Sequence, residues 1–198
     1  MNPRRGIIIA CALLALPACD PISTGIGVAA TAGTAAVQER GFTGTANDAG
    51  VKFRVSEAYF RASEKMFLSI TVRVLEGRVM LLGGLADKAL RERAVALAWA
   101  QPGVKEVIDE LQAAEEGFGA YARDAWIAAQ ISAGLMGDEQ VLAVNYYIDA
   151  VNGVVYVMGV AQDQAELDRV LYRAGDVKYV KKVVSHVLLK DDPRRKQG

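Results

Sequence analysis

The most informative part of the chain is Asn152-Gly153-Val154-Val155-Tyr156-Val157-Met158-Gly159, because it joins a turn signal to an apolar strand. An Asn-Gly pair favours the two-residue turn of a β-hairpin, in which both central residues have positive φ. Apolar residues alternate over 144–148 before the turn, and Val155 and Val157 continue the inward face after it. The stretch therefore predicts two antiparallel strands joined by a tight hairpin.

A helix is predicted on each side of this hairpin. Ile127, Ile131 and Leu135 recur at every fourth residue, which predicts a helix from about Ala120 to Gly137 with one buried stripe. Beyond the hairpin, an aspartate and a glutamate stand three residues apart in the pattern of a capping box. Asp163 and Glu166 mark the start of the second helix, and Leu167, Val170 and Leu171 form its buried stripe. A valine-rich run from about Val177 to Leu189 predicts the last strand.

The hairpin stretch occurs twice in the chain. Gly77–Gly83 corresponds to Gly153–Gly159, and Asp48–Val51 corresponds to Asp124–Ile127, in both cases at an offset of 76 residues. An internal repeat predicts two copies of one structural unit. After a three-residue deletion, 104–107 also aligns with 177–180. We therefore expect an α+β protein with two tandem αββαβ domains, at 46–114 and 120–190, followed by a basic tail at 191–198.

The N-terminus has the pattern of an export signal. Arg4 and Arg5 precede an apolar run from Ile7 to Leu16, which is too short to span a bilayer. The next residues, through Pro17 and Ala18 to Cys19, resemble the lipobox of bacterial lipoproteins. That resemblance predicts a cleaved signal at 1–18, acylation of Cys19 and a flexible Ala/Gly-rich tether at 19–45. An ordinary signal peptide that contains a cysteine is the alternative.

Composition argues against two other classes of function. The chain has 23 basic and 23 acidic residues, so it lacks the basic excess of a nucleic-acid-binding protein. Its one histidine is His186, and the expected mature chain keeps only Cys19, which the lipid consumes. These residues exclude a histidine–cysteine nucleophile and a zinc cluster. We expect no enzyme activity and no cofactor besides the covalent lipid on Cys19, and we expect His186 to lie on a strand face.

The repeated αββαβ pattern, with valine-rich strands that end at Gly83 and Gly159, resembles the BON domain family. Two such domains behind a lipobox and a tether resemble the outer-membrane lipoproteins of that family. The resemblance implies a periplasm-facing protein that binds anionic phospholipid through the first helix of its second domain. It also implies a role in outer-membrane integrity and an association with the outer-membrane protein assembly machinery.

The first helix of the second copy has an unusual outer face. On a helical wheel, Trp126 lies with three small residues, Ala122, Ala129 and Ala133, away from the core stripe, and Arg123 is the nearby cation. Tryptophan suits the interface between lipid and water. We expect this face to contact phospholipid, with packing against the first domain as the alternative. By contrast, the first-copy helix carries six charges and is expected to be solvated.

Two further questions stay open at the level of sequence. The cations of family members after the tryptophan are absent here, so any preference for anionic lipid depends on Arg123, on Lys178, Lys181 and Lys182, or on the solvated basic tail. Asp20 favours the inner membrane in some bacteria, which leaves the choice of membrane open. A structural or adaptor role is the alternative function. Outward-facing Met80, Leu82, Tyr156 and Met158 are expected to supply contact between the domains, or to bind a partner.

Overall fold

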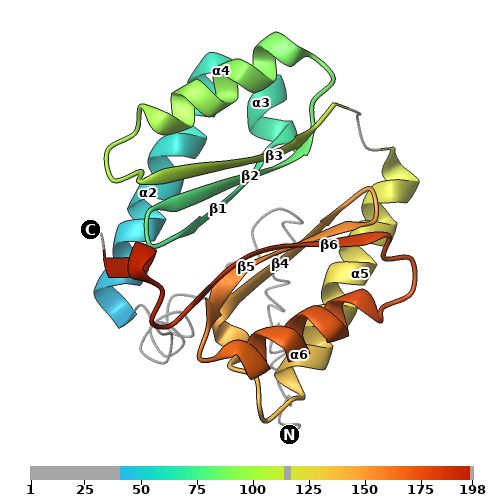
Figure 1. The fold of residues 1–198 in the computed structure, drawn as a ribbon. Coiled ribbons are helices and arrows are strands. Elements are labelled where there is room, and N and C mark those ends of the chain that lie inside the picture. The colour runs from blue at the N-terminus through green and yellow to red at the C-terminus, as the bar shows by residue number, and fades with distance from the viewer. Residues whose placement is uncertain (1–40, 114–116, 197–198) are drawn as a thin grey trace, which may run out of the picture.

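The computed structural model describes residues 41–113 and 117–196, so the signal sequence, Cys19 and most of the expected tether lie outside the described residues. Two α+β domains follow one another along the chain (Figure 1). The first contains α2 (Gly41–Ala62), α3 (Glu64–Ser69), β1 (Thr71–Leu75), β2 (Arg78–Gly84), α4 (Lys88–Trp99) and β3 (Glu106–Gln112). The second contains α5 (Phe118–Met136), the 3₁₀ turn η1 (Ala143–Asn145), β4 (Tyr146–Val151), β5 (Val154–Ala161), α6 (Gln164–Gly175) and β6 (Lys182–Leu189). A last 3₁₀ turn, η2, spans Pro193–Lys196.

Each domain is built on a three-stranded mixed sheet. The hairpin strands β1 and β2 are antiparallel, and β3 returns beside β2 in the parallel direction after α4. The second domain repeats this order with β4, β5 and β6. The predicted αββαβ class is thus confirmed, with a short helical segment added between the first helix and the first strand of each domain. The described α2 begins five residues before the expected domain start at residue 46.

The offset of 76 residues persists to the end of the second domain. Arg78 pairs with Glu106 in the first sheet, and Val154 pairs with Lys182 in the second (154 − 78 and 182 − 106). The expected three-residue deletion is therefore wrong. The last strand begins at Lys182 rather than Val177, because Tyr179 adopts a positive φ that a strand cannot contain. Residue 144 likewise lies in η1 and not in the predicted strand.

A buried aspartate fixes each hairpin turn. The carboxylate of Asp48 accepts hydrogen bonds from the backbone N–H groups of Glu76 and Gly77, at 2.8 and 2.9 Å. Asp124 does the same for Asn152 and Gly153, at 2.5 and 2.8 Å. All four turn residues have positive φ, as the Asn-Gly signal predicts. The repeated aspartates thus connect the first helix of each domain to its hairpin.

Each helical layer covers one face of its own sheet. In the second domain the predicted stripe of Ile127, Ile131 and Leu135 is buried, and it packs on Val155 and Val157 of β5. In the first domain Val51, Val55 and Tyr59 of α2 take the equivalent place. Helix α6 begins at the predicted cap, where the Asp163 carboxylate accepts a hydrogen bond from the N–H of Glu166 at 2.8 Å.

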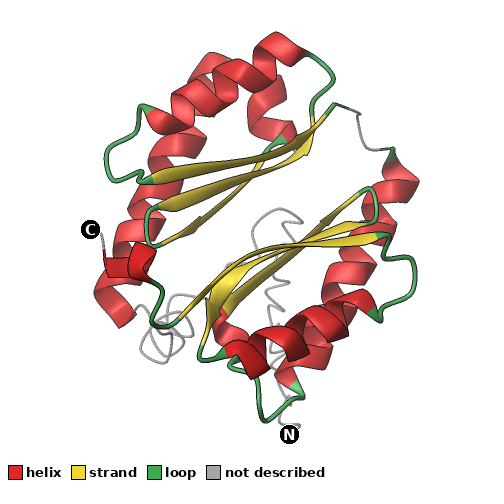
Figure 2. Ribbon diagram, in the orientation of Figure 1, coloured by secondary structure: helices red, strands yellow, loops and turns green. Residues whose placement is uncertain are grey.

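The other faces of the two sheets pack against each other, so the molecule has four layers with the helices outside (Figure 2). One apolar cluster draws on both sheets, and it buries the residues that were expected to point outward. The contact predicted between the domains is therefore confirmed. The cluster contains Leu75, Met80, Leu82, Ile108, Val151, Tyr156, Met158 and Val160.

Polar contacts close the edges of this interface. The guanidinium of Arg73 makes two hydrogen bonds to the Asp149 carboxylate, at 2.7 and 2.8 Å. The imidazole of His186 lies 2.8 Å from a carboxylate oxygen of Glu110, which places this histidine on a strand face as predicted. Both pairs join residues that are 76 positions apart, so corresponding positions of the two domains meet across the interface. The domains are consequently related by an approximate twofold axis.

The start of the basic tail packs against the first domain. Arg195 of η2 makes a bidentate ion pair with Glu76 in the first hairpin turn, with N–O distances of 2.7 and 2.9 Å, and both side chains are largely buried. Arg194 remains exposed, and its hydrogen bonds lower the pKa of the Asp192 carboxyl to about 2. The expectation of a wholly solvated tail is therefore wrong for Arg195, because its guanidinium finds a carboxylate partner on the first domain.

Candidate functional site

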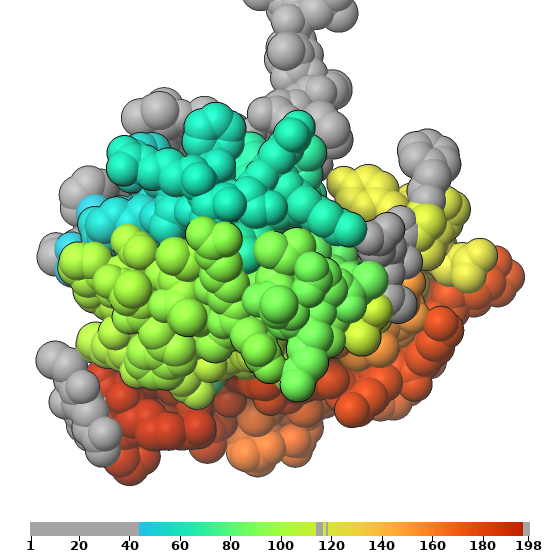
Figure 3. Space-filling model, turned by 90° about the horizontal axis from the view of Figure 1, so that it is seen from above, coloured from blue at the N-terminus to red at the C-terminus, as the bar shows by residue number. Residues whose placement is uncertain are grey.

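The outer face of α5 is accessible to solvent. The side chain of Trp126 is 43 % exposed, whereas tryptophan side chains in folded proteins are on average mostly buried. The four other residues predicted to contact lipid are also exposed: Ala122, Arg123, Ala129 and Ala133. The yellow N-terminal part of α5 lies beside the first domain and not beneath it (Figure 3). The alternative that this face packs under the first domain therefore has no support in the structure.

Trp126 does not stand alone on this surface. Its ring packs edge-to-face against Tyr179, with centroids 5.9 Å apart and an angle of 67° between the ring planes. Tyr179 comes from the turn between α6 and β6 and is 50 % exposed. The sequence pattern does not indicate a role for this tyrosine, because the predicted strand runs through it. Trp126 and Tyr179 form a half-exposed aromatic pair, which we call the aromatic pair below.

Two cations lie on the same aromatic pair. The guanidinium carbon of Arg123 is 5.4 Å from the centroid of the Tyr179 ring, and Nζ of Lys178 is 4.7 Å from it. Both distances are within the range of a cation–π contact. Within 41–113 and 117–196, neither cation forms an ion pair with a carboxylate. Of the cations proposed from sequence, Arg123 and Lys178 are thus brought together, whereas Lys181 donates to the backbone oxygen of Asn152.

The first domain has a different exposed surface. Phe53 and Phe60 lie two helical turns apart on α2 and are 68 % and 66 % exposed. Phe67 packs edge-to-face on Phe60 at 5.3 Å, and Leu68 beside it is also exposed. We call these four residues the phenylalanine surface. Helix α2 is solvated as expected, but counting its charges missed this surface. Helical spacing of Phe53 and Phe60 was the available signal.

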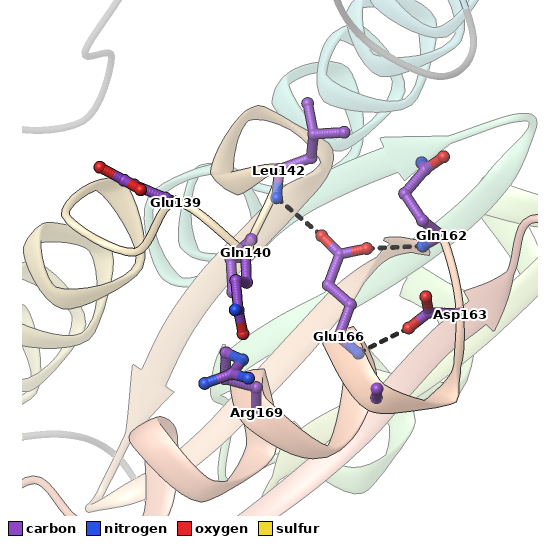
Figure 4. A pocket seen from close by; sticks show the side chains of 9 residues that line it. Glu139, Gln140, Leu142, Gln162, Asp163, Glu166 and Arg169 are labelled. Carbon is purple, nitrogen blue, oxygen red and sulfur yellow. Dashed lines mark hydrogen bonds between the residues drawn. The ribbon is translucent and has the colours of Figure 1, made fainter.

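A cavity of about 350 Å³ lies at the start of α6 (Figure 4). Its buried carboxylate, Glu166, accepts hydrogen bonds from the backbone N–H groups of Leu142 and Gln162, at 2.7 and 2.6 Å. The predicted capping box is therefore only half formed, since Glu166 does not bond back to the N-cap residue. Burial and the charge of Glu166 raise the pKa of Tyr146 nearby. These polar groups serve the fold, which makes the cavity a weaker candidate than the face of α5.

No helix in the described part of the chain has the length and apolar character needed to cross a bilayer. Across the same residues, no group of three or more histidine, cysteine, aspartate or glutamate side chains is arranged to hold a metal ion. The aromatic pair with its two cations is our candidate site, because it brings exposed aromatic and basic side chains together on one surface.

The chain is thus a tandem repeat of a small αββαβ domain, in which the two domains pack sheet against sheet. Comparison with known families identifies this domain: the BON domain family matches residues 47–115 and 123–191, and the chain belongs to this family. Proteins of the family are generally non-enzymatic.

Three relatives of known sequence cover most of the chain. A protein of Anaplasma centrale, described as an uncharacterized protein in the gshII 5′ region, is 40% identical over 76% of this chain and 99% of its own length. The outer membrane lipoprotein DolP of Haemophilus influenzae is 30% identical over 80% of this chain and 83% of its own. Osmotically-inducible protein Y of Escherichia coli is 29% identical over 69% and 70%. The chain is thus related to DolP and to osmotically-inducible protein Y.

Proposed function

We propose that this chain is a non-enzymatic lipoprotein of the outer membrane that contacts phospholipid through the face of α5 and supports the integrity of that membrane. The observation that carries the proposal is the exposure of Trp126 among three exposed alanines. An indole combines a large apolar ring with one N–H donor, which suits the depth of the lipid headgroups. Small neighbouring side chains allow the helix face to approach the membrane closely.

The proposed anchor is Cys19, which lies outside the described residues. Several acyl chains hold a protein on a membrane almost permanently, since each buried methylene contributes about 0.8 kcal/mol. The similarity to an outer membrane lipoprotein supports the periplasmic face of the outer membrane as the location, with the inner membrane as the alternative because of Asp20. Labelled palmitate should enter the wild-type chain in cells and should not enter Cys19→Ser.

Contact with lipid is tested with the chain from Asp20 to Gly198, which contains every described residue but no acyl anchor. Vesicles made from equal parts of phosphatidylcholine and phosphatidylglycerol are sedimented with the protein. Trp126→Glu should lower the bound fraction at least about tenfold, because a carboxylate would have to enter the interface in place of an indole. Phe60→Glu is the matched control, since it changes an exposed aromatic residue on the equivalent helix of the other domain.

The controls give the test a clear outcome. Circular dichroism must show that both variants stay folded, which the exposure of both rings leads us to expect. Binding that is unchanged in Trp126→Glu rejects the α5 site. An equal loss in Phe60→Glu would assign the effect to added negative charge and not to the site.

The phenylalanine surface favours a second candidate function, in which the first domain binds an envelope protein such as a component of the outer-membrane assembly machinery. Tyr156 and Met158, which first motivated this adaptor role, are buried between the sheets and are unavailable to a partner. Photocrosslinking in cells from residue 60 should capture a specific envelope protein if this role is correct, and residue 172 serves as an exposed control position.

A further inference from the structure

The turn at residues 176–181 joins α6 to β6 and lies beside the outer face of α5, where it carries half of the aromatic pair. Tyr179 in this turn has a φ of 74°, in the left-handed region that residues with a side chain rarely adopt. Two other described non-glycine residues, Glu76 and Asn152, share this feature, and both occupy hairpin turns that require it. Tyr179 is therefore a tyrosine held in a disfavoured backbone conformation.

The equivalent turn of the first domain shows which residue type suits this backbone conformation. Its corresponding residue, 76 positions earlier, is Gly103, with a φ of 87°. Glycine adopts this conformation without strain, whereas any other L-residue is disfavoured there. The position that corresponds to Trp126 is also a glycine, Gly50. Both members of the aromatic pair thus occupy places that are glycine in the first domain.

The charges around the pair differ between the domains in the same way. Arg123 and Lys178 correspond to Asn47 and Pro102, which carry no charge. In the second domain, two cations and two aromatic rings thus occur together on one exposed surface. Strained residues that persist in a fold are concentrated at functional sites. The strain at Tyr179, its exposure and the added cations are separate observations that agree.

We propose that the turn between α6 and β6 is a second membrane-contacting element, in which Tyr179 enters the headgroup layer beside Trp126. The proposal rests on the proposed function of α5 and extends the site to a separate segment of the chain. The phenol ring supplies an apolar body with a polar hydroxyl, as the indole does. Arg123 and Lys178 then face the phosphate groups of the lipid, so the turn contributes both the second ring and one of the two cations.

The experiment uses the chain from Asp20 to Gly198 with Trp99→Phe, so that Trp126 is its one fluorophore of this type. Emission is titrated with vesicles of phosphatidylcholine alone and with equal parts of phosphatidylcholine and phosphatidylglycerol. Tyr179→Gly and Tyr179→Ala should each weaken binding to the mixed vesicles about fivefold, and Tyr179→Phe should stay within about twofold of the parent. Tyr172→Ala removes a tyrosine of α6 that is more exposed than Tyr179, and it should leave the affinity unchanged.

Stability supplies a second measurement that separates function from folding. Neither Tyr179→Gly nor Tyr179→Ala has the ring, but glycine fits the positive φ, so the glycine variant should unfold at a higher denaturant concentration than the alanine variant. Weaker binding in the more stable of the two would show that the tyrosine acts on the vesicle and not through the fold. Parental affinity in Tyr179→Gly overturns this proposal, and it leaves the α5 site to be judged by Trp126→Glu alone.

Discussion

The two domains use one backbone plan but place their exposed aromatic residues differently. In the second domain the rings stand on the flank of the first helix and in the turn before the last strand, at Trp126 and Tyr179. In the first domain both places are glycine, and exposed rings lie at other positions, among them Phe53 and Phe60 on α2, Phe67 on α3 and Trp99 on α4. The comparison separates what the repeat preserves, which is the core and the turns, from what each copy has acquired on its surface.

Substitutions between the two sheets should destabilise the protein most, and they test whether the sheets form one interface. Leu82 and Met158 correspond to each other and are both buried in the cluster between the sheets. Leu82→Asp and Met158→Asp should each lower the free energy of unfolding by at least about 4 kcal/mol, because each buries an unpaired carboxylate. Denaturant titration measures the loss, and Ala129→Asp on the exposed face of α5 is the control. A small effect in either variant would mean that the sheets separate readily.

The next effect concerns the aspartates that hold the hairpin turns. Asp48→Ala and Asp124→Ala each leave two backbone N–H groups without their carboxylate, so each should cost about 3 kcal/mol of unfolding free energy. The two losses should be similar, since the geometry is the same in both domains. Chemical denaturation gives both values, and a large difference between them would break the equivalence of the turns.

A smaller effect is expected at the turn where the domains differ. Gly103→Ala should destabilise the protein by about 1–2 kcal/mol, because alanine is disfavoured at this φ and its Cβ would lie 3.0 Å from Cγ2 of Val51. Gly134→Ala, in an open position on α5, is the control and should not destabilise the fold. Thermal unfolding compares the two variants. If Gly103→Ala is harmless, the turn is less constrained than its geometry indicates.

The smallest change in unfolding free energy is expected for substitutions in the C-terminal tail. Arg195→Ala should cost about 1 kcal/mol, because it removes a bidentate and largely buried ion pair with Glu76. The exposed pair between Arg194 and Asp192 offers a matched comparison, and Arg194→Ala should leave the unfolding free energy unchanged within error. The difference between the two variants should shrink at high salt. Equal effects would show that burial of the Arg195 pair is unimportant.

Much of the fold follows from local patterns in the sequence. The Asn-Gly turn, the buried stripe of α5, the cap at Asp163 and the contact between the sheets were all predicted correctly. These features depend on residues that are close in sequence or that repeat with a fixed period. The repeat also predicted that the two domains share one topology, which the strand order confirms.

The features that the sequence did not predict depend on distant residues or on uncommon backbone geometry. Asp48 and Asp124 were recognised as matching positions, but their carboxylates bond to turns 28 and 29 residues away, which no local pattern indicates. Tyr179 was placed in a strand because tyrosine and valine favour strands, and its positive φ has no signature in its own residue type. The available clue was that Tyr179 corresponds to Gly103 at the offset of 76 residues, because glycine at an equivalent position indicates a positive φ.

Contacts across the approximate twofold axis have a consequence for self-association. Two identical copies of the first domain, docked in the same way, would set Arg73 against Arg73 and Glu110 against Glu110. In the single chain the partners at these places are Asp149 and His186, so each repulsive match of such a homodimer is an attractive one here. The charges at these places therefore favour contact between the two different domains over contact between two copies of the first, and the covalent link keeps the matched domains close together.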